Sequence, residues 1–223
     1  MTPIMATTQA SLYNVVYALV AEEDPEGGLL AGGNTYALTK PTKWDSTVDI
    51  TDGAEYEQKD GDGGICCAAS ACDIIKGESG SLELCKYDPL FESFATGTVL
   101  HTNGTGDAVG NAKAFGNLDC EKTYTVEIWQ RICVNGARAA GFYREGVSGV
   151  TFTPNNGAAE EGFRTIAYKW RSKGGPFYLG GRRGILNDWQ GEFSQLGGKY
   201  LDLGGSLPTY PTDALIPNAS LPA

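Results

Sequence analysis

The segment that decides the fold runs from Gly61 to Gly97 and reads GDGGICCAASACDIIKGESGSLELCKYDPLFESFATG. Its pattern predicts a Gly/Asp turn, a short apolar strand, a loop, an alternating strand and a short helix. Asp88 can accept hydrogen bonds from the first backbone N–H groups of that helix, and Pro89 suits its first position, where no N–H is needed. Gly97 ends the helix because glycine adopts a left-handed conformation without strain. These signals describe a scaffold and carry no chemistry.

Alternating apolar and polar residues outside this segment predict further strands. The longest pattern is Lys122–Val134, and Asn135-Gly136 then gives a tight-turn signal. The other expected strands are Lys43–Thr51, Ile65–Ala69, Ser81–Tyr87, Val99–His101, Val147–Thr153 and Phe163–Arg171. Residues 102–116 are rich in Gly and Asn and are expected to form a long exposed loop. We therefore predict an antiparallel β-sandwich or barrel with one short flanking α-helix and extended N- and C-terminal arms.

Three regions are expected along the chain. Residues 1–40 are interpreted as an N-terminal arm with loops, residues 41–178 as the β-sandwich domain, and residues 179–223 as a Gly/Pro-rich C-terminal arm. The apolar run Leu12–Ala21 is not preceded by Lys or Arg and contains Asn14. Both features favour a strand or a docking arm over a secretory signal. No membrane insertion by this chain is expected.

The charge is distributed unevenly over the chain, whose net charge is −10. Residues 1–130 contain 20 acidic residues and 7 lysines, a net charge of −13, whereas residues 131–223 contain 7 acidic and 10 basic residues, a net charge of +3. One interpretation is a solvated surface. The other is self-association, in which an acidic surface of one copy meets an arginine-bearing surface of the next. Tight nucleic-acid binding is disfavoured for so acidic a chain.

The residues that usually carry chemistry are sparse. His101 is the only histidine, which leaves little room for a Ser-His-Asp or Cys-His apparatus, and Glu127 beside Trp129 is the best candidate acid. We expect no catalytic residue, no cofactor and no metal. The six cysteines are expected as reduced, buried thiols, with a disulfide as the alternative; they are Cys66, Cys67, Cys72, Cys85, Cys120 and Cys133. Zinc is disfavoured because no C-x-x-C pair occurs.

One family resemblance rests on the same segment. Its matching residues are Cys72, Asp73, Lys76, Gly77, Leu82, Leu84, Asp88, Pro89, Leu90, Thr96 and Gly97. They resemble the major tail tube proteins of bacteriophages with long, non-contractile tails (the siphophage tail tube family). The resemblance implies hexameric rings whose inner strands join into a continuous β-barrel. It also implies rings stacked head to tail into a conduit for DNA.

The resemblance carries further expectations about place and partners. The chain is expected in the virion tail, assembled in the host bacterial cytoplasm. Its partners would be other copies of itself, a tape-measure protein and a tail terminator, with double-stranded DNA passing through without specific binding. Candidate acidic lumen or inter-subunit residues are Asp45, Asp49, Glu55, Glu57 and Glu127. Candidate ring–ring interface residues are Arg182, Arg183, Trp189 and Phe193.

Two alternatives remain at this point. The first is another phage structural protein, such as a tail terminator or a capsid decoration protein. The second is a secreted β-sandwich that binds carbohydrate on exposed aromatic rings; the candidates for such platforms are Trp44, Trp129, Trp170 and Trp189.

Overall fold

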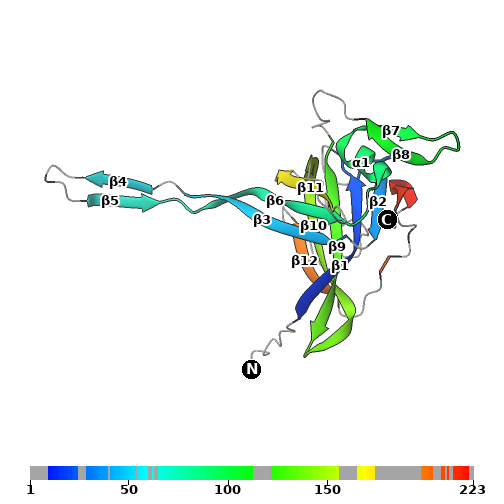
Figure 1. Cartoon of the computed structure of the whole chain (residues 1–223). Coiled ribbons are helices and arrows are strands. Elements are labelled where there is room, and N and C mark those ends of the chain that lie inside the picture. Colours follow the sequence, from blue (N-terminus) through cyan, green and yellow to red (C-terminus); the bar gives the residue numbers. More distant parts are fainter. Residues whose placement is uncertain are drawn as a thin grey trace.

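The fold of the chain is given by a computed structural model. It describes residues 10–24, 29–39, 41–53, 55–59, 62, 65–112, 122–155, 165–173, 197–202, 207–208, 210 and 213–220. Over these residues the protein is mostly antiparallel β-structure with one short α-helix (Figure 1), which confirms the predicted fold class.

A nine-stranded sheet forms the body of the protein. Its order is β13 (Ala214–Pro217), β2 (Asn34–Thr39), β1 (Ser11–Glu22), β9 (Tyr124–Val134), β10 (Ala137–Asn155), β11 (Ile166–Lys173), β6 (Ile74–Leu84) and β3 (Lys43–Thr51). The ninth strand, β12 (Gly197–Asp202), pairs with β10. Two separate ribbons, β4 (Glu55–Lys59) with β5 (Ile65–Ser70) and β7 (Val99–Thr102) with β8 (Ala108–Ala112), extend from this body.

The main core lies between the two halves of the sheet and the helix α1 (Pro89–Thr96). Phe91 and Phe94 of the helix pack against aromatic side chains from four strands: Tyr36, Tyr124, Phe152 and Tyr168. Offset and edge-to-face aromatic contacts of this kind add to the stabilisation that burial alone gives.

The helix forms as predicted. The Oδ1 atom of Asp88 accepts hydrogen bonds from the N–H groups of Leu90 and Phe91 at 3.0 and 3.1 Å. Gly97 ends the helix with φ 69°, and its N–H donates to the carbonyl of Ser93. The hydroxyl of Tyr36 donates to the second oxygen of Asp88. The helix start is therefore fixed to strand β2 as well as capped.

The second face of β1, β2, β9 and β10 is also buried. Tyr17, Leu19, Trp129 and Phe142 form a smaller core there, together with Ile216 of β13. Two partly buried residues from the C-terminal region, Leu207 and Tyr210, pack on the same cluster. The described parts of the C-terminal region thus return to their own sheet, both here and through β12.

The hairpin between β9 and β10 confirms the predicted turn and strands. Asn135 and Gly136 both have positive φ, 52° and 78°, the backbone that a tight hairpin turn needs. Val150 and Phe152 of β10 are buried, as are Tyr168 and Trp170 of β11. Strand β10 is 19 residues long, so it joins β9 along its first part and β11 along its last part.

Three local expectations were wrong. In the described part of residues 1–40, Ser11–Glu22 and Asn34–Thr39 form strands rather than an arm, since β1 lies between β2 and β9 within the sheet. Within the expected loop 102–116, Ala108–Ala112 forms β8 and pairs with β7, so only 103–107 form the exposed connection, and 113–116 lie outside the described residues. Lys76 and Gly77, expected in a loop, belong to β6. In the first and third cases pairing with distant strands outweighs weak local signals, and in the second case a short local hairpin forms.

Candidate assembly surfaces

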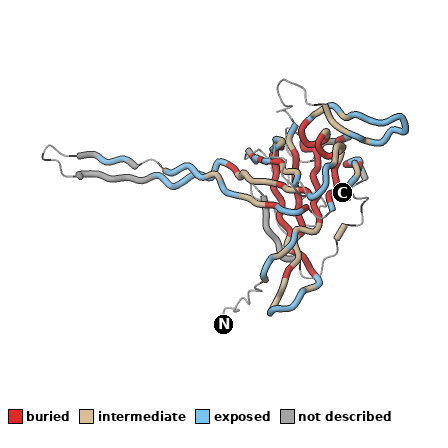
Figure 2. The backbone as a smooth tube through the Cα atoms, viewed as in Figure 1, coloured by how far each residue is buried: buried red, intermediate tan, exposed pale blue. Residues whose placement is uncertain are grey.

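The most prominent surface feature is a two-stranded extension, residues 48–78, which we call the arm. It comprises the outer part of β3, the β4–β5 ribbon and the first residues of β6, and it projects far from the body (Figures 1 and 2). Its root is part of the main sheet, where β6 pairs with β11 on one side and β3 on the other. The body therefore fixes the arm at its base.

The arm exposes large apolar side chains. Ile50 and Ile75 are paired across β3 and β6 and are 56% and 54% exposed. Ile74 is 62% exposed and Tyr56 on β4 is 67% exposed. A single two-stranded ribbon is at best marginally stable in water, and contiguous exposed apolar groups usually mark a protein contact.

The close approach of the two sides of the arm between β3 and β4 depends on Gly53. A Cβ atom at this position would lie 1.7 Å from the carbonyl oxygen of Ala71, so only glycine allows the two chains to approach so closely. The N–H of Gly53 donates to the Asp73 carboxylate at 2.9 Å. The two sides of the arm are thus joined at Gly53 by a hydrogen bond as well as by close contact.

A second surface, which we call the polar face, covers the outward side of β3, β6, β11 and the end of β10. Its described residues, none of them buried, are Lys43, Asp45, Thr47, Asp49, Ser79, Ser81, Glu83, Lys169, Arg171, Thr151, Thr153 and Asn155. Three cationic and three anionic groups balance one another on this face. A shallow depression of about 440 Å³ lies among its hydroxyl groups.

The acidic groups of the polar face are engaged by neighbours. Asp45 accepts hydrogen bonds from the N–H and hydroxyl of Ser81 and pairs with Lys43 Nζ at 2.6 Å. Burial by itself would raise the pKa of Asp45, but the hydrogen bonds from Lys43 and Ser81 outweigh it and hold that pKa below its usual value. Asp49 accepts from the hydroxyl of Ser79 at 3.0 Å and lies 3.8 Å from Arg171 Nε.

Gly80 allows β3 to lie close to β6 beneath this face. A Cβ atom at Gly80 would lie 2.0 Å from the carbonyl oxygen of Asp45 and 2.9 Å from Cε2 of Trp170. The glycine also makes room for the stacked rings of Trp44 and Trp170 on the core side. The root of the arm therefore rests on a tightly packed corner of the core.

Glu127 does not belong to an exposed acidic surface, so this expectation was wrong. Its side chain is fully buried on the second face of β9, where Oε1 lies 3.6 Å from Nη2 of the buried Arg144. The Arg144 guanidinium in turn lies 5.0 Å from the centre of the Trp129 ring. The alternation of residues along β9 puts Glu127 on the face opposite the main core. That face is not exposed, because the smaller core around Trp129 covers it.

The structure distributes the other acidic candidates along one hairpin. Asp45 and Asp49 lie on β3 and Glu55 and Glu57 on β4, so only the first two belong to the polar face. Glu57 is exposed on the arm. Sequence reasoning missed the arm itself, although the acidic residues around Tyr56 and the glycine-rich stretch that follows are typical of an exposed hairpin.

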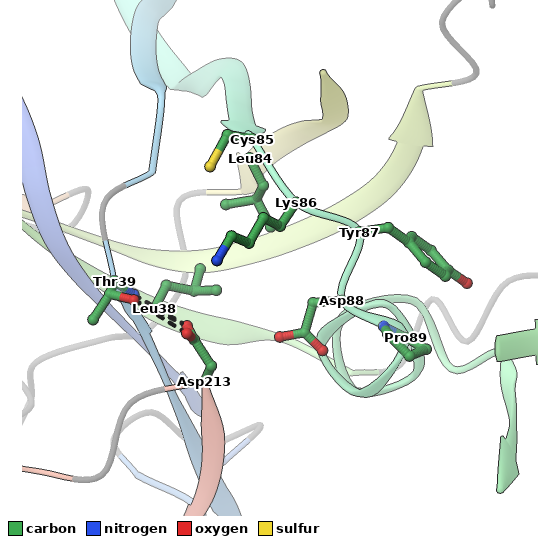
Figure 3. A pocket seen from close by; sticks show the side chains of 9 residues that line it. All are labelled: Leu38, Thr39, Leu84, Cys85, Lys86, Tyr87, Asp88, Pro89 and Asp213. Carbon is green, nitrogen blue, oxygen red and sulfur yellow. Dashed lines mark hydrogen bonds between the residues drawn. The ribbon is translucent and has the colours of Figure 1, made fainter. Parts of the chain in front are cut away.

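A groove of about 450 Å³ opens where β2, β6 and α1 meet (Figure 3). Lys86 reaches into it from the segment before the helix, and Cys85 lies at its upper edge. Its carboxylates both accept hydrogen bonds: Asp88 from Tyr36 and the helix, and Asp213 from Thr39. These bonds hold the corner of the body together, and we assign the groove a structural role.

Several other sequence-based candidates have a definite place. Trp44, Trp129 and Trp170 are buried, so the expectation that they form exposed sugar-stacking platforms was wrong for all three. Cys72 and Cys85 are exposed free thiols, which corrects the expectation that they are buried, and Cys133 is a half-buried free thiol. His101 is exposed on β7. Arg182, Arg183, Trp189 and Phe193 lie outside the described residues.

Within the described part of the chain, no cluster of three or more His, Cys, Asp or Glu side chains could hold a metal ion. The same residues contain no helix that is long and apolar enough to span a membrane.

Comparison with known proteins adds no relative. No known protein family, no curated protein and no solved structure matches this chain.

Proposed function

We propose that this protein is a structural subunit of a bacteriophage tail tube, which self-assembles into stacked hexameric rings around a conduit for DNA. The observation that carries the proposal is the arm. It exposes Ile50, Tyr56, Ile74 and Ile75 on a ribbon that stands apart from the body. Such a ribbon gains stability when other copies cover it.

The polar face is our candidate for the lumen. Two of its three cations are offset by neighbouring carboxylates, with Lys43 close to Asp45 and Glu83 and with Arg171 close to Asp49. Phosphate groups of passing DNA would therefore meet few available cations, and the hydroxyl groups between them carry no net charge. The face is nearly neutral rather than strongly acidic, although it contains Asp45 and Asp49, two of the candidate acidic lumen residues.

An open sheet edge supports lateral assembly. Among the described strands β3 pairs with β6 alone, so within this part of the structure its other edge along Lys43–Thr51 has no strand beside it. Exposed edges of this length readily pair with another chain. Closure of a ring through this edge would continue the sheet into the neighbouring subunit, as the sequence resemblance implies.

The proposed setting follows from the same assembly. The protein would be located in the virion tail after assembly in the host cytoplasm, with a tape-measure protein inside the tube and a terminator at its end. A tail terminator is the nearest competing role and would form a single ring. Tubes of many stacked rings separate the two roles.

The proposal is tested by shortening the arm. Thr51 and Ile74 are opposite each other in β3 and β6, so residues 52–73 can be replaced by Asn-Gly without removing the main sheet. Sedimentation velocity at increasing concentration should show tubes of stacked rings for the wild type and nothing larger than single rings for the variant, which keeps the β3 edge but lacks the arm. A circular dichroism spectrum and a melting temperature close to those of the wild type would show that the variant is folded. Equal assembly of both proteins would contradict the proposal.

A further inference from the structure

We propose that the arm of one copy docks on the β9–β10 hairpin end of another copy, and that opposite charge sets the register of this contact. We call that hairpin end, residues 131–141, the tip. The inference rests on the proposed function and deepens it, because it assigns the two surfaces that join successive copies.

The arm is the acidic partner. Residues 48–78 contain eight acidic residues and two lysines, a net charge of −6. Asp49 lies near the base of the arm and has Arg171 of its own chain close by. Asp52 and Glu57 lie farther out, and both are exposed. The negative charge therefore extends beyond the reach of the body's own cations.

The tip is the basic partner. Residues 128–144 include Arg131, Arg138 and Arg144 and contain no Asp or Glu. Arg144 is buried beside Glu127, whereas Arg131 is half-buried and Arg138 is exposed near the turn. The acidic residues that flank this stretch, Glu127 and Glu145, are both buried. In the sheet register Asp202 of β12 lies opposite Phe142, the residue that follows the tip.

Apolar side chains accompany the charges on both surfaces. Leu12 of β1 is 45% exposed and lies opposite Ile132 at the root of the tip. The arm presents its isoleucines next to its acidic residues. A contact that buries apolar groups in its centre and places opposite charges at its rim has the usual anatomy of a protein interface.

The geometry requires two copies. The arm and the tip project from the body in different directions, and the arm points away from the tip of its own chain (Figure 1). A contact between two different surfaces of identical chains is heterologous, and it produces closed rings or open stacks rather than simple dimers. This is the kind of contact that a tube needs.

Charge reversal with rescue tests the contact. The arm variant Asp52→Lys/Glu57→Lys and the tip variant Arg138→Glu each place like charges opposite one another, and the combined variant restores attraction. All three positions are exposed, so the variants should fold, as melting temperatures will show. Lys169→Glu, a reversal on the polar face, is the matched control. The readout is the protein concentration at which assemblies appear in sedimentation velocity at low salt.

We expect the arm and tip variants each to raise this threshold by about tenfold or more, which corresponds to about 1.4 kcal/mol per contact. The combined variant should return it to within about threefold of the wild type, and the control should leave it unchanged. Unchanged thresholds, or a combined variant no better than its parents, would overturn the contact while leaving the proposed function intact. A wild type that remains monomeric throughout would reject the proposed function and the contact together.

Discussion

Trp44 and Trp170 lie face to face in the core, with ring centroids 4.5 Å apart and planes inclined by only 6°. They come from β3 and β11, the two neighbours of β6. The stack therefore joins three strands at the point from which the arm extends. Its existence depends on Gly80, the residue of β6 that lies opposite Trp170.

Substitution of Gly80 by alanine should destabilise the body. The new Cβ atom would clash with the Asp45 backbone and with the Trp170 ring, and relief requires β3 to move. We expect a loss of about 1–3 kcal/mol in the free energy of unfolding, measured by urea denaturation. Gly104→Ala is the control, since nothing lies within 4 Å of its added Cβ, and it should change stability little. Equal effects of both variants would refute the packing argument.

Asp88 and Tyr36 should be energetically coupled. Asp88→Ala removes a helix cap, worth about 1 kcal/mol, and leaves a buried tyrosine hydroxyl without this acceptor. Tyr36→Phe removes the same hydrogen bond from the other side. In a double-mutant cycle the two losses should fall short of additivity by about 0.5–1.5 kcal/mol. Strict additivity would mean that the hydrogen bond does not stabilise the fold.

The buried pair of Glu127 and Arg144 predicts an asymmetric response to mutation. Glu127→Ala should cost about 3–5 kcal/mol in unfolding free energy because it leaves the Arg144 charge buried without this carboxylate. The double variant Glu127→Gln/Arg144→Met removes both charges and should be distinctly more stable than the single variant. Thermal and urea unfolding compare the two. A double variant as unstable as Glu127→Ala would argue against a charge effect.

Asp45 should contribute stability that depends on pH. Because hydrogen bonds from Lys43 and Ser81 lower its folded-state pKa below 3.8, the contribution is present above that pH and is lost as the pH falls through the folded pKa. The side chain is 43% exposed, so we expect less than about 1 kcal/mol. The difference in unfolding free energy between wild type and Asp45→Asn should be constant from about pH 7 to about pH 5 and shrink toward about pH 3. A pH-independent difference would contradict this account.

Local signals in the sequence predicted the elements that depend on local chemistry. The helix after Asp88, the Asn135-Gly136 turn and the long alternating strand before it all form because their caps, turns and periodicity agree with the fold. The prediction that Asp45 and Asp49 lie on the polar face of β3 is also correct, and their carboxylates accept hydrogen bonds from Ser81 and Ser79 there.

Features that depend on distant strands could not be read from the sequence. In the sequence Glu127 alternates with core residues as a solvent-facing side chain would. It is buried because the smaller core covers the second face of β9, on which Glu127 lies. Strand β1 has the composition of either a strand or an arm, and its pairing with β2 and β9 decides between them. The length and exposure of the arm likewise follow from where β6 meets β11.

Electron microscopy of the purified wild-type protein, concentrated in low-salt buffer, tests the central claim most directly. We predict rings with six-fold symmetry or hollow tubes built from them, with Asp45 and Asp49 facing the central channel in a reconstruction. A uniform population of monomers at the same concentration, or assemblies without a central channel, would contradict the tail tube proposal.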